Sequence, residues 1–228
     1  MGILTGYISF VCFILLAAKY VARKTKNYKV DHFLKGLHKP VSCIFFISSV
    51  LHLFLVLPVL KGRSLPVTVS GSISIVFAIL LVLLCHIIKN GQKKMFWHRM
   101  MTVVLLAVVI LHVITYYVDF AQYKNKIKET EIADVNITTV PNGVYIGEYD
   151  VGYIYAKAQV TVMDGKISEI EILEHRNERG SRAENIIEDI LAEQRIDVDA
   201  VTGATNSSLV IEKACENAIS GWYAINKK

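Results

Sequence analysis

The sequence predicts a two-part protein, in which an all-α membrane bundle of four helices is followed by a small α+β domain outside the cytoplasm. Hydrophobic residues make up 53% of the chain, and they gather in long apolar stretches before residue 120. The remainder has the composition of a soluble domain, and two pairs of histidines in the membrane half share one spacing. We therefore divide the chain into a membrane part (1–120), a connector (121–140) and an outer domain (141–228).

Four stretches are predicted to cross the membrane, namely residues 3–18, 41–60, 73–88 and 100–120. A helix needs about 20 mostly apolar residues to cross the hydrocarbon core, and the flanks of the shorter stretches supply the missing length. The first stretch has no basic start, and no A-x-A-like site precedes the charged run after it. We expect it to be a retained helix and not a cleaved signal peptide.

The loops between these stretches differ in charge. The first loop, KYVARKTKNYKVDHFLKGLHK, and the third, KNGQKKMFWHR, are rich in Lys and Arg, whereas the second, KGRSLPVTVSGS, holds only Lys61 and Arg63. Because cytoplasmic loops carry the excess of Lys and Arg, the first and third loops are expected inside. The chain is then a multi-pass protein of the cell membrane, with its N-terminus and outer domain outside the cytoplasm. Its net charge of +5 fits these loops and membrane lipid, so no nucleic-acid partner is predicted.

Two pairs of histidines lie at equal spacing in the second and fourth stretches. His38 and His52 are 14 residues apart, and so are His98 and His112. Fourteen helical residues rise about 21 Å in nearly four turns, so each pair lies on one side of its helix. Both stretches run outward, which places His38 level with His98 and His52 level with His112. Ionisable groups within a membrane stretch are costly and usually mark a pathway or a site.

Two facing imidazoles at each level predict two bis-histidine b-type haems. Neutral imidazole binds several metals, but no carboxylate or thiolate completes a four-ligand site at either level. The four cysteines form no CxxC motif and imply no disulfide framework. Two axial imidazoles complete a haem iron, and such iron favours electron transfer over oxygen binding. The alternatives are that His86 or His32 replaces an inner ligand, that the inner histidines are merely solvated, or that the histidines relay protons. Candidate partners for haem propionates are Lys39, Arg99, Lys61 and Arg63.

With this spacing and order of spans, the membrane part resembles the b-type cytochromes of the ferric reductase and NADPH oxidase kind. It also resembles the small four-helix cytochromes found alongside flavinylated proteins. The ferric reductase pattern normally has more spans and a cytoplasmic domain for flavin and NADPH. Neither is found in this sequence, so the source of electrons is left open.

The outer domain is predicted to contain strands followed by helices. NGVYIGEYDVGY predicts a strand and a turn, and Asp164-Gly165 between KAQVTVM and KISEIEILEH predicts a hairpin. AENIIEDILAE is expected to be a helix whose apolar face is made by Ile186, Ile187, Ile190 and Leu191. A last helix follows, with an apolar face made by Leu209, Ile211, Ala214, Cys215 and Ala218.

The stretch DAVTGAT, residues 199–205, lies between these two helices. Thr205 stands just before the last helix, whose N-terminus offers unpaired N–H groups and a positive dipole end that suit a phosphate. Gly203 permits a tight turn, and the small Ala204 leaves room for a bulky group. Three further residues can cap the helix or bind phosphate oxygens, namely Asn206, Ser207 and Ser208. Taken alone, these features also fit an ordinary capped loop.

From VYIGEY through AKAQVTVMDGKISEIEILEH to VDAVTGATNSSLVIEKACENAI, the outer domain resembles the FMN-binding domain. That domain occurs in subunits of the sodium-pumping NADH:quinone reductase and the Rnf complex. The family pattern of Asp, two residues, Ser or Thr, Gly, Ala, Thr is met by Asp199, Thr202, Gly203, Ala204 and Thr205. The resemblance implies that a flavin transferase outside the cytoplasm joins FMN to Thr205 through a phosphoester. Candidates for contact with the flavin ring, with a structural role as the alternative for each, are His175, Gly180 and Tyr153.

Together the two halves predict a transmembrane electron-transfer component of an oxidoreductase, with no catalytic side chain of its own. Electrons would pass through the two haems to an FMN on Thr205. The expected partners are the flavin transferase, a cytoplasmic or quinol electron donor and an acceptor outside the cytoplasm. Two alternatives remain, a membrane-anchored flavin redox sensor or regulator and a conduit that runs inward to the quinone pool.

Overall fold

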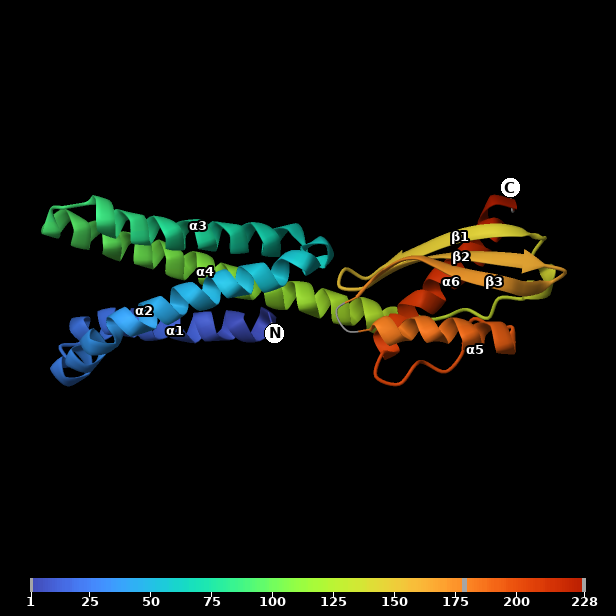
Figure 1. The fold of residues 1–228 in the computed structure, drawn as a ribbon, viewed down its shortest axis with the longest axis horizontal. Coiled ribbons are helices and arrows are strands. Elements are labelled where there is room, and N and C mark those ends of the chain that lie inside the picture. The colour runs from blue at the N-terminus through green and yellow to red at the C-terminus, as the bar shows by residue number, and fades with distance from the viewer. Residues whose placement is uncertain (1, 178–179, 227–228) are drawn as a thin grey trace. The chain divides into compact units, whose positions relative to one another are not determined.

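The computed structural model describes residues 2–177 and 180–226. The chain forms two compact units, Met1–Asp119 and Phe120–Lys228. The first is all helical, and the second combines a sheet with helices (Figure 1). The predicted fold class, a four-helix membrane part and a small α+β domain, is confirmed.

The first unit contains four helices that are long and apolar enough to cross a membrane, and it is consistent with a membrane protein. Each is longer than the stretch predicted from hydropathy, because the polar flanks continue the helix. In lipid every backbone N–H and C=O needs a partner within the segment, which a continuous helix provides. The helices are α1 (Gly2–Lys24), α2 (Tyr28–Val56), extended by the 3-10 helix η1 (Leu57–Gly62), α3 (Leu65–Ile87) and α4 (Gly91–Glu129).

Polar contacts join the helices of this unit. The hydroxyl of Ser9 on α1 donates to that of Ser48 on α2 at 2.8 Å, and both side chains are buried. The hydroxyl of Ser70 on α3 lies 3.1 Å from that of Thr115 on α4. Small hydroxyl residues allow close approach and bond across helices in a membrane. The α1–α2 and α3–α4 pairs are therefore each fastened by side-chain hydroxyls.

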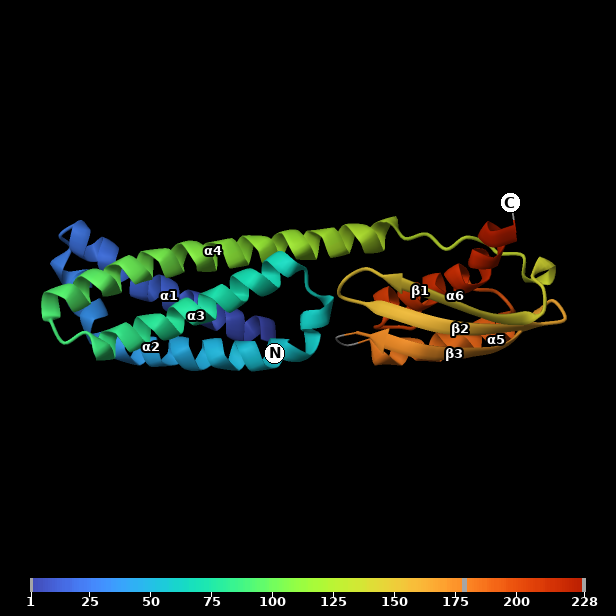
Figure 2. The same ribbon diagram turned by 90° about the horizontal axis from the view of Figure 1, so that it is seen from above.

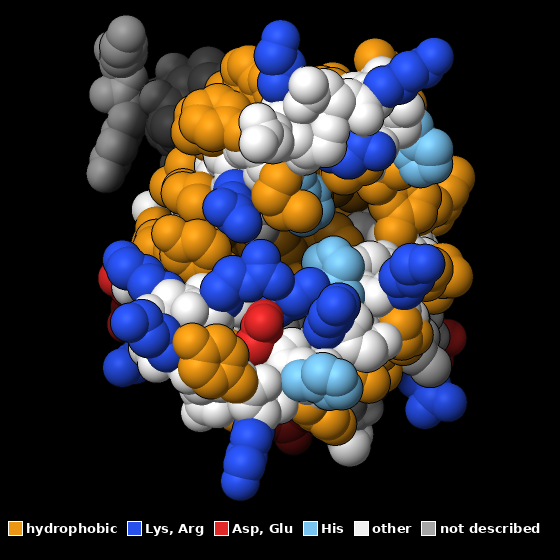
Figure 3. Space-filling view, turned by 90° about the vertical axis from the view of Figure 1, so that its left-hand side faces the viewer, with side chains coloured by type: hydrophobic (Ala, Val, Ile, Leu, Met, Phe, Trp, Pro, Cys, Tyr) orange, Lys and Arg blue, Asp and Glu red, His pale blue; other side chains and the backbone are white. Residues whose placement is uncertain are grey.

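Basic residues collect at one end of the helical unit. The loops that join α1 to α2 and α3 to α4 both lie there (Figure 1), and Figure 3 shows Lys, Arg and His side chains over this end. The loop sequences at 19–39 and 89–99 supply these charges. Which side of the membrane this end faces stays a prediction.

The second unit is built on a three-stranded antiparallel sheet in the order β1-β2-β3. The predicted hairpin at Asp164-Gly165 is confirmed, since Met163 pairs with Lys166 across it. Asp164 and Gly165 have φ of 51° and 71°, as a type I′ turn requires. The strands are β1 (Gly143–Asp150), β2 (Tyr155–Met163) and β3 (Lys166–Arg176).

Helices cover one face of this sheet, with α6 over β1 and β2 and α5 beside β3 (Figures 1 and 2). Alternate residues of β2 are fully buried against them, namely Ala156, Ala158, Val160 and Val162. The predicted faces of both helices join this core, although Leu209 is only half-buried and its neighbour Val210 is buried. The remaining elements are the 3-10 helices η2 (Ile137–Thr139) and η3 (Ser181–Asn185), with α5 (Ile186–Glu193) and α6 (Thr205–Asn226).

Gly147 on β1 marks the closest approach of the sheet to α6. A Cβ at this position would overlap the backbone nitrogen of Ala218 and the carbonyl oxygen of Ala214. Backbone atoms cannot move aside as a side chain does, so only glycine permits this packing distance. The position of α6 on the sheet therefore depends on this residue.

The segment predicted as a connector is helical as far as Glu129 and then packs along the second unit. Tyr123 and Ile127 on the last turns of α4 lie against the core. The backbone N–H of Ala133 donates to the carboxylate of Glu216 at 3.0 Å, and the Lys213 ammonium donates to the carbonyl of Glu131 at 2.9 Å. These contacts hold residues 130–133 against α6.

Glu212 is a buried carboxyl in the core-facing part of α6. It is 3% exposed, and its Oε1 accepts the backbone N–H of Val198 at 3.1 Å. Burial raises the pKa of this carboxyl from 4.5 to about 7, and the charge of Asp197 adds to the rise while the bond from Val198 opposes it. Near neutral pH the folded unit therefore holds a proton that the unfolded chain has released.

We expect the second unit to lose stability as the pH rises from about 4.5 to about 7, because a raised carboxyl pKa favours the folded state only below that window. Glu212→Gln keeps an acceptor for Val198 and has no charge to bury. At pH 8 the free energy of unfolding of this variant should exceed that of the wild type by about 2 kcal/mol. Its free energy of unfolding should also vary less with pH. Near-UV circular dichroism of the full chain in detergent measures the stability and its dependence on pH. Glu193→Gln, at an exposed position, is the control. Equal slopes for wild type and Glu212→Gln would contradict the assignment.

Candidate functional site

The DAVTGAT loop ends in a tight turn. The backbone N–H of Ala204 donates to the carbonyl of Val201 at 2.9 Å, which places Thr202 and Gly203 at the two central positions. Gly203 has φ of 80°, the value that the third residue of a type II turn adopts. A side chain there would be strained, so the glycine is explained by backbone conformation. Asp199 lies exposed two residues before the turn begins.

The turn leads directly into α6, and Thr205 is the first residue of that helix. Ser208, which is fully buried, accepts the N–H of Val201 through its hydroxyl at 3.1 Å and so fixes the turn from within. Its own N–H donates to the carbonyl of Ala204 at 2.9 Å. The side chains of Thr205 and Asn206 are exposed by contrast. The loop therefore presents the exposed Thr205 side chain at the N-terminus of a helix, and the hydrogen bonds of the buried Ser208 fix the first turn of that helix.

Gly180 packs against this first turn. A Cβ at Gly180 would lie 2.6 Å from the Cβ of Ser207 and would overlap its hydroxyl. Ser207 is only 3% exposed, so it has no room to withdraw. The N–H of Gly180 donates to the side-chain oxygen of Asn177 at 2.9 Å. Space therefore explains the glycine, in agreement with the structural role that the sequence left open for it, and its contact with the flavin stays a prediction.

His175 at the end of β3 belongs to the same network. Its Nδ1 lies 2.9 Å from the Glu184 carboxylate and 3.3 Å from the amide nitrogen of Asn177. The side chain is 2% exposed, and its Nε2 is buried with no hydrogen-bond partner in the part of the chain that the structure describes. Through Asn177 and Gly180 this histidine is linked to the first turn of α6.

Tyr153, the third candidate for flavin contact, is buried in an aromatic cluster. Its ring stacks on that of Tyr123, with centroids 4.7 Å apart, and lies 5.8 Å from that of Phe120. The phenolic oxygen of Tyr123 accepts a hydrogen bond from the Asn206 side chain at 3.0 Å. Tyr123 thus lies beside Thr205. Sequence reasoning missed it because residues 121–140 were expected to be a connector.

We call His52 and His112 the outer histidines, after the side of the membrane predicted for them, and His38 and His98 the inner histidines. Each outer histidine packs on a glycine of the neighbouring helix. The ring of His52 would be 3.0 Å from a Cβ at Gly6 on α1, and its Nδ1 donates to the carbonyl of Gly2 at 2.8 Å. A carbonyl can only accept, so Nδ1 carries a proton, and in the neutral form of the ring the lone pair is on Nε2.

His112 repeats this arrangement on α3. Its ring would be 3.0 Å from a Cβ at Gly71, and its Nδ1 lies 3.1 Å from the hydroxyl of Ser70. That hydroxyl donates its own hydrogen to the carbonyl of Pro66 at 2.7 Å, so its oxygen is left to accept the ring N–H. The two glycines have no signal in the sequence beyond their small size, and sequence reasoning missed both.

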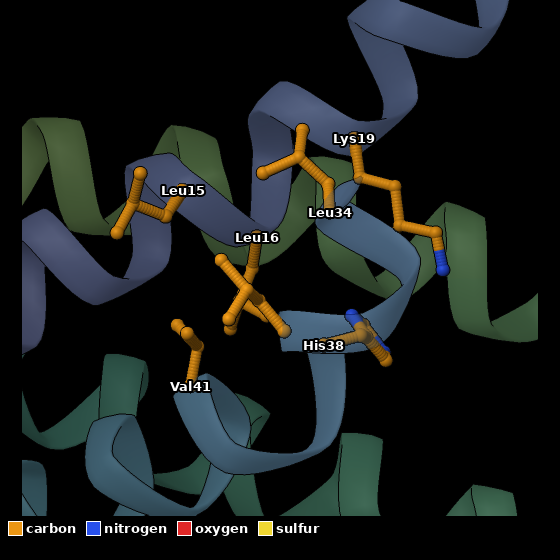
Figure 4. A pocket seen from close by; sticks show the side chains of 7 residues that line it. Leu15, Leu16, Lys19, Leu34, His38 and Val41 are labelled. Atoms are coloured by element: carbon orange, nitrogen blue, oxygen red, sulfur yellow. The ribbon is translucent and has the colours of Figure 1, made fainter. Parts of the chain in front are cut away.

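The inner histidines lie close together. The ring centroids of His38 and His98 are 6.1 Å apart, with their planes at 81°. The Nδ1 of His98 is 3.4 Å from the thiol of Cys85, whereas the Nδ1 of His38 is buried without a partner among the described residues. His38 also lines a small pocket with Lys19 of α1 (Figure 4), a residue that sequence reasoning did not single out.

The alternative inner ligands are placed differently. His32 and His86 are both exposed, and the Nδ1 of His86 bonds the carbonyl of Val82 one turn earlier in its own helix. This placement favours His38 and His98 as the inner pair, although the ligands themselves stay a prediction. Of the predicted propionate partners, Lys39, Arg99 and Lys61 are exposed and Arg63 is half-buried.

Within residues 2–177 and 180–226, no three or more His, Cys, Asp and Glu side chains are arranged to hold a bare metal ion. A haem iron needs only two protein ligands, so pairs of histidines are the relevant arrangement.

Comparison with known proteins bears on the second unit. A family model for the FMN-binding domain matches residues 152–220, which run from the β1–β2 turn to the middle of α6. No curated protein and no solved structure matches the chain. The match supports FMN as a cofactor and a flavin-linked electron-transfer role.

We expect Gly180→Ala to destabilise the second unit by about 1–3 kcal/mol, because its Cβ would overpack Ser207 in the first turn of α6. Gly221→Ala is the matched control, since a Cβ there meets open space and alanine favours the helix. Thermal unfolding of the full chain in detergent compares the two. A Gly180→Ala protein as stable as the wild type would show that this contact does not constrain the site.

Proposed function

We propose that this chain is a transmembrane electron-transfer protein. Its histidine pairs would hold two b-type haems, His38 with His98 and His52 with His112, and Thr205 would carry FMN through a phosphoester outside the cytoplasm. Bound haem and FMN supply one-electron transfer and, on the flavin, exchange between single electrons and pairs. The observation that carries the proposal is the fixed tautomer of the outer histidines.

The outer pair has what an axial ligand requires. An imidazole that binds a metal through Nε2 usually donates its Nδ1–H to a second group, which sets the tautomer and orients the ring. The carbonyl of Gly2 does this for His52, and the hydroxyl of Ser70 does it for His112. Both rings thus leave Nε2 with a lone pair and have no freedom to turn it away.

The distance between the rings of the inner pair, His38 and His98, is compatible with a metal ion between them. A coordinated imidazole nitrogen lies about 2 Å from a transition metal, so two rings on opposite sides of one ion have centroids roughly 6 Å apart. The observed separation of His38 and His98 is 6.1 Å. Unlike the rings of His52 and His112, the ring of His38 has no hydrogen-bond partner for its buried Nδ1 among the described residues.

The FMN site is supported by the family match and by the form of the loop. An acceptor hydroxyl must be reached by the flavin transferase, and the Thr205 side chain is exposed. The first turn of α6 offers backbone N–H groups to a phosphate, and the bonds of Ser208 hold that turn in place. Asp199 and Thr202 are exposed nearby, where an enzyme that recognises the pattern meets them.

The proposed orientation of the chain in the membrane depends on the positive charge of its loops. The basic loops of the helical unit lie at one end, which we assign to the cytoplasm (Figure 3). The second unit, after four spans, is then outside, where the flavin transferase acts. The donor would be a cytoplasmic carrier or a quinol, and the acceptor would lie outside the cytoplasm.

Intact-mass measurement of the purified full chain tests the flavin site. The wild type should carry the added mass of one FMN, and Thr205→Val should carry none. Thr202→Val is the matched control, because it removes a neighbouring exposed hydroxyl and leaves the acceptor in place. We expect it to retain flavin, in reduced amount. Flavin on Thr205→Val, or its absence from the wild type, would refute the assignment.

Absorbance spectra test the haems. The reduced wild type should show the α-band of b-type haem, and His112→Ala should lose about half of the haem, since one of two sites loses an axial ligand. Ser70→Ala should keep both haems and shift the midpoint potential of one, because it removes one acceptor of the ring N–H. His86→Ala, at an exposed position, should match the wild type. Loss of haem in His86→Ala but not in His98→Ala would overturn the inner pair.

A further inference from the structure

The last turns of α4 belong to the second unit, which begins at Phe120. Three residues at helical spacing pack on its core, namely Phe120, Tyr123 and Ile127. This segment precedes the stretch matched by the FMN-binding family model, so the family match says nothing about it. It therefore adds a surface to the unit that lies outside the matched stretch.

Tyr123 has one ring face against Tyr153, with centroids 4.7 Å apart and planes within 25°. Phe120 closes the cluster at 6.0 Å from Tyr123 and 5.8 Å from Tyr153. Within this cluster Tyr153 is buried, whereas Tyr123 is only half-buried. Tyr123 is thus an aromatic ring that stacks on a buried ring and is itself only partly buried.

This ring lies next to the proposed attachment point. The phenolic oxygen of Tyr123 accepts a hydrogen bond from the side chain of Asn206 at 3.0 Å, and Asn206 is the residue directly after Thr205. Both Thr205 and Asn206 are exposed, so a group carried by Thr205 is free to turn toward the phenol.

Resting on the proposed attachment of FMN, we propose that Tyr123 is the stacking surface for the isoalloxazine ring of the flavin carried by Thr205. A planar aromatic ring gains about 0.5–1.5 kcal/mol by stacking on another, beyond the area that is buried. The tether makes this contact intramolecular, and an effective concentration in the millimolar range lets such a modest energy place the ring. The end of the last membrane helix then forms one wall of the flavin site.

The fluorescence of the attached flavin tests this placement. A phenol in contact with a photoexcited flavin donates one electron to it and takes the electron back, so light emission is quenched without net reaction. Phenylalanine keeps the ring but is too hard to oxidise to do this. In the full chain in detergent, Tyr123→Phe should therefore raise flavin fluorescence several-fold and leave the visible circular dichroism of the flavin unchanged.

Tyr123→Leu should raise the fluorescence and also weaken the visible circular dichroism, because it removes the stacking partner. The matched control is Tyr145→Phe, since that phenol donates instead to the carbonyl of Pro141, before β1. Should Tyr123→Leu fail to fold, Tyr123→Phe still decides the question. Fluorescence in Tyr123→Phe equal to that of the wild type and of Tyr145→Phe would overturn the proposal. Intact mass, measured first on each protein, separates this outcome from a failure of FMN attachment itself.

Discussion

An imidazole within the membrane unit needs an acceptor for its ring N–H, because lipid offers none, and the helix packing around His52 and His112 follows from that need. His52 reaches the carbonyl of Gly2, and His112 reaches the hydroxyl of Ser70. Each ring packs closely on a glycine of the neighbouring helix, Gly6 in one case and Gly71 in the other, where a Cβ would lie 3.0 Å from the ring. The helices thus work as two similar pairs, in which the first helix of each pair orients the histidine of the second. A ring held in this way has little rotational freedom, which would lower the entropic cost of binding the proposed haem iron.

The second unit solves a related problem with backbone and small side chains. The proposed attachment of FMN requires Thr205 to be both accessible and fixed in position, and neighbouring residues of the structure meet these two requirements separately. Thr205 and Asn206 are exposed, while Ser207 and Ser208 face inward and are almost completely buried. Ser207 fills the space left by Gly180, and Ser208 holds the N–H of Val201. The exposed threonine is therefore carried on a rigid first turn.

The features that could be predicted from the sequence are those that depend on residues close together in the chain. Hydropathy shows the four helices, the Asp164-Gly165 pair shows the hairpin, and equal spacing places the histidines on one side of each helix. Contacts between distant segments leave no such trace. Gly6 and Gly71 are unremarkable in the sequence, and only the packed helices show that they lie under His52 and His112. Gly180 was noted as a possible flavin contact, but its physical role is to make room for Ser207, which lies on another element.

The segment after residue 120 shows how a composition boundary and a physical boundary can differ. Its many lysines and glutamates suggest a linker, yet one of its faces is committed to the domain that follows. Glu216 is 6% exposed, and its carboxylate is satisfied by the N–H of Ala133 and by Lys213, which in turn bonds the carbonyl of Glu131. Without residues 131–133 that carboxylate would lose a partner inside the protein, a cost of the kind that destabilises small domains. The same segment supplies Tyr123, which covers Tyr153. The folded unit that carries Thr205 therefore includes the end of α4, so the proposed flavin site would be built by more of the chain than the family model covers.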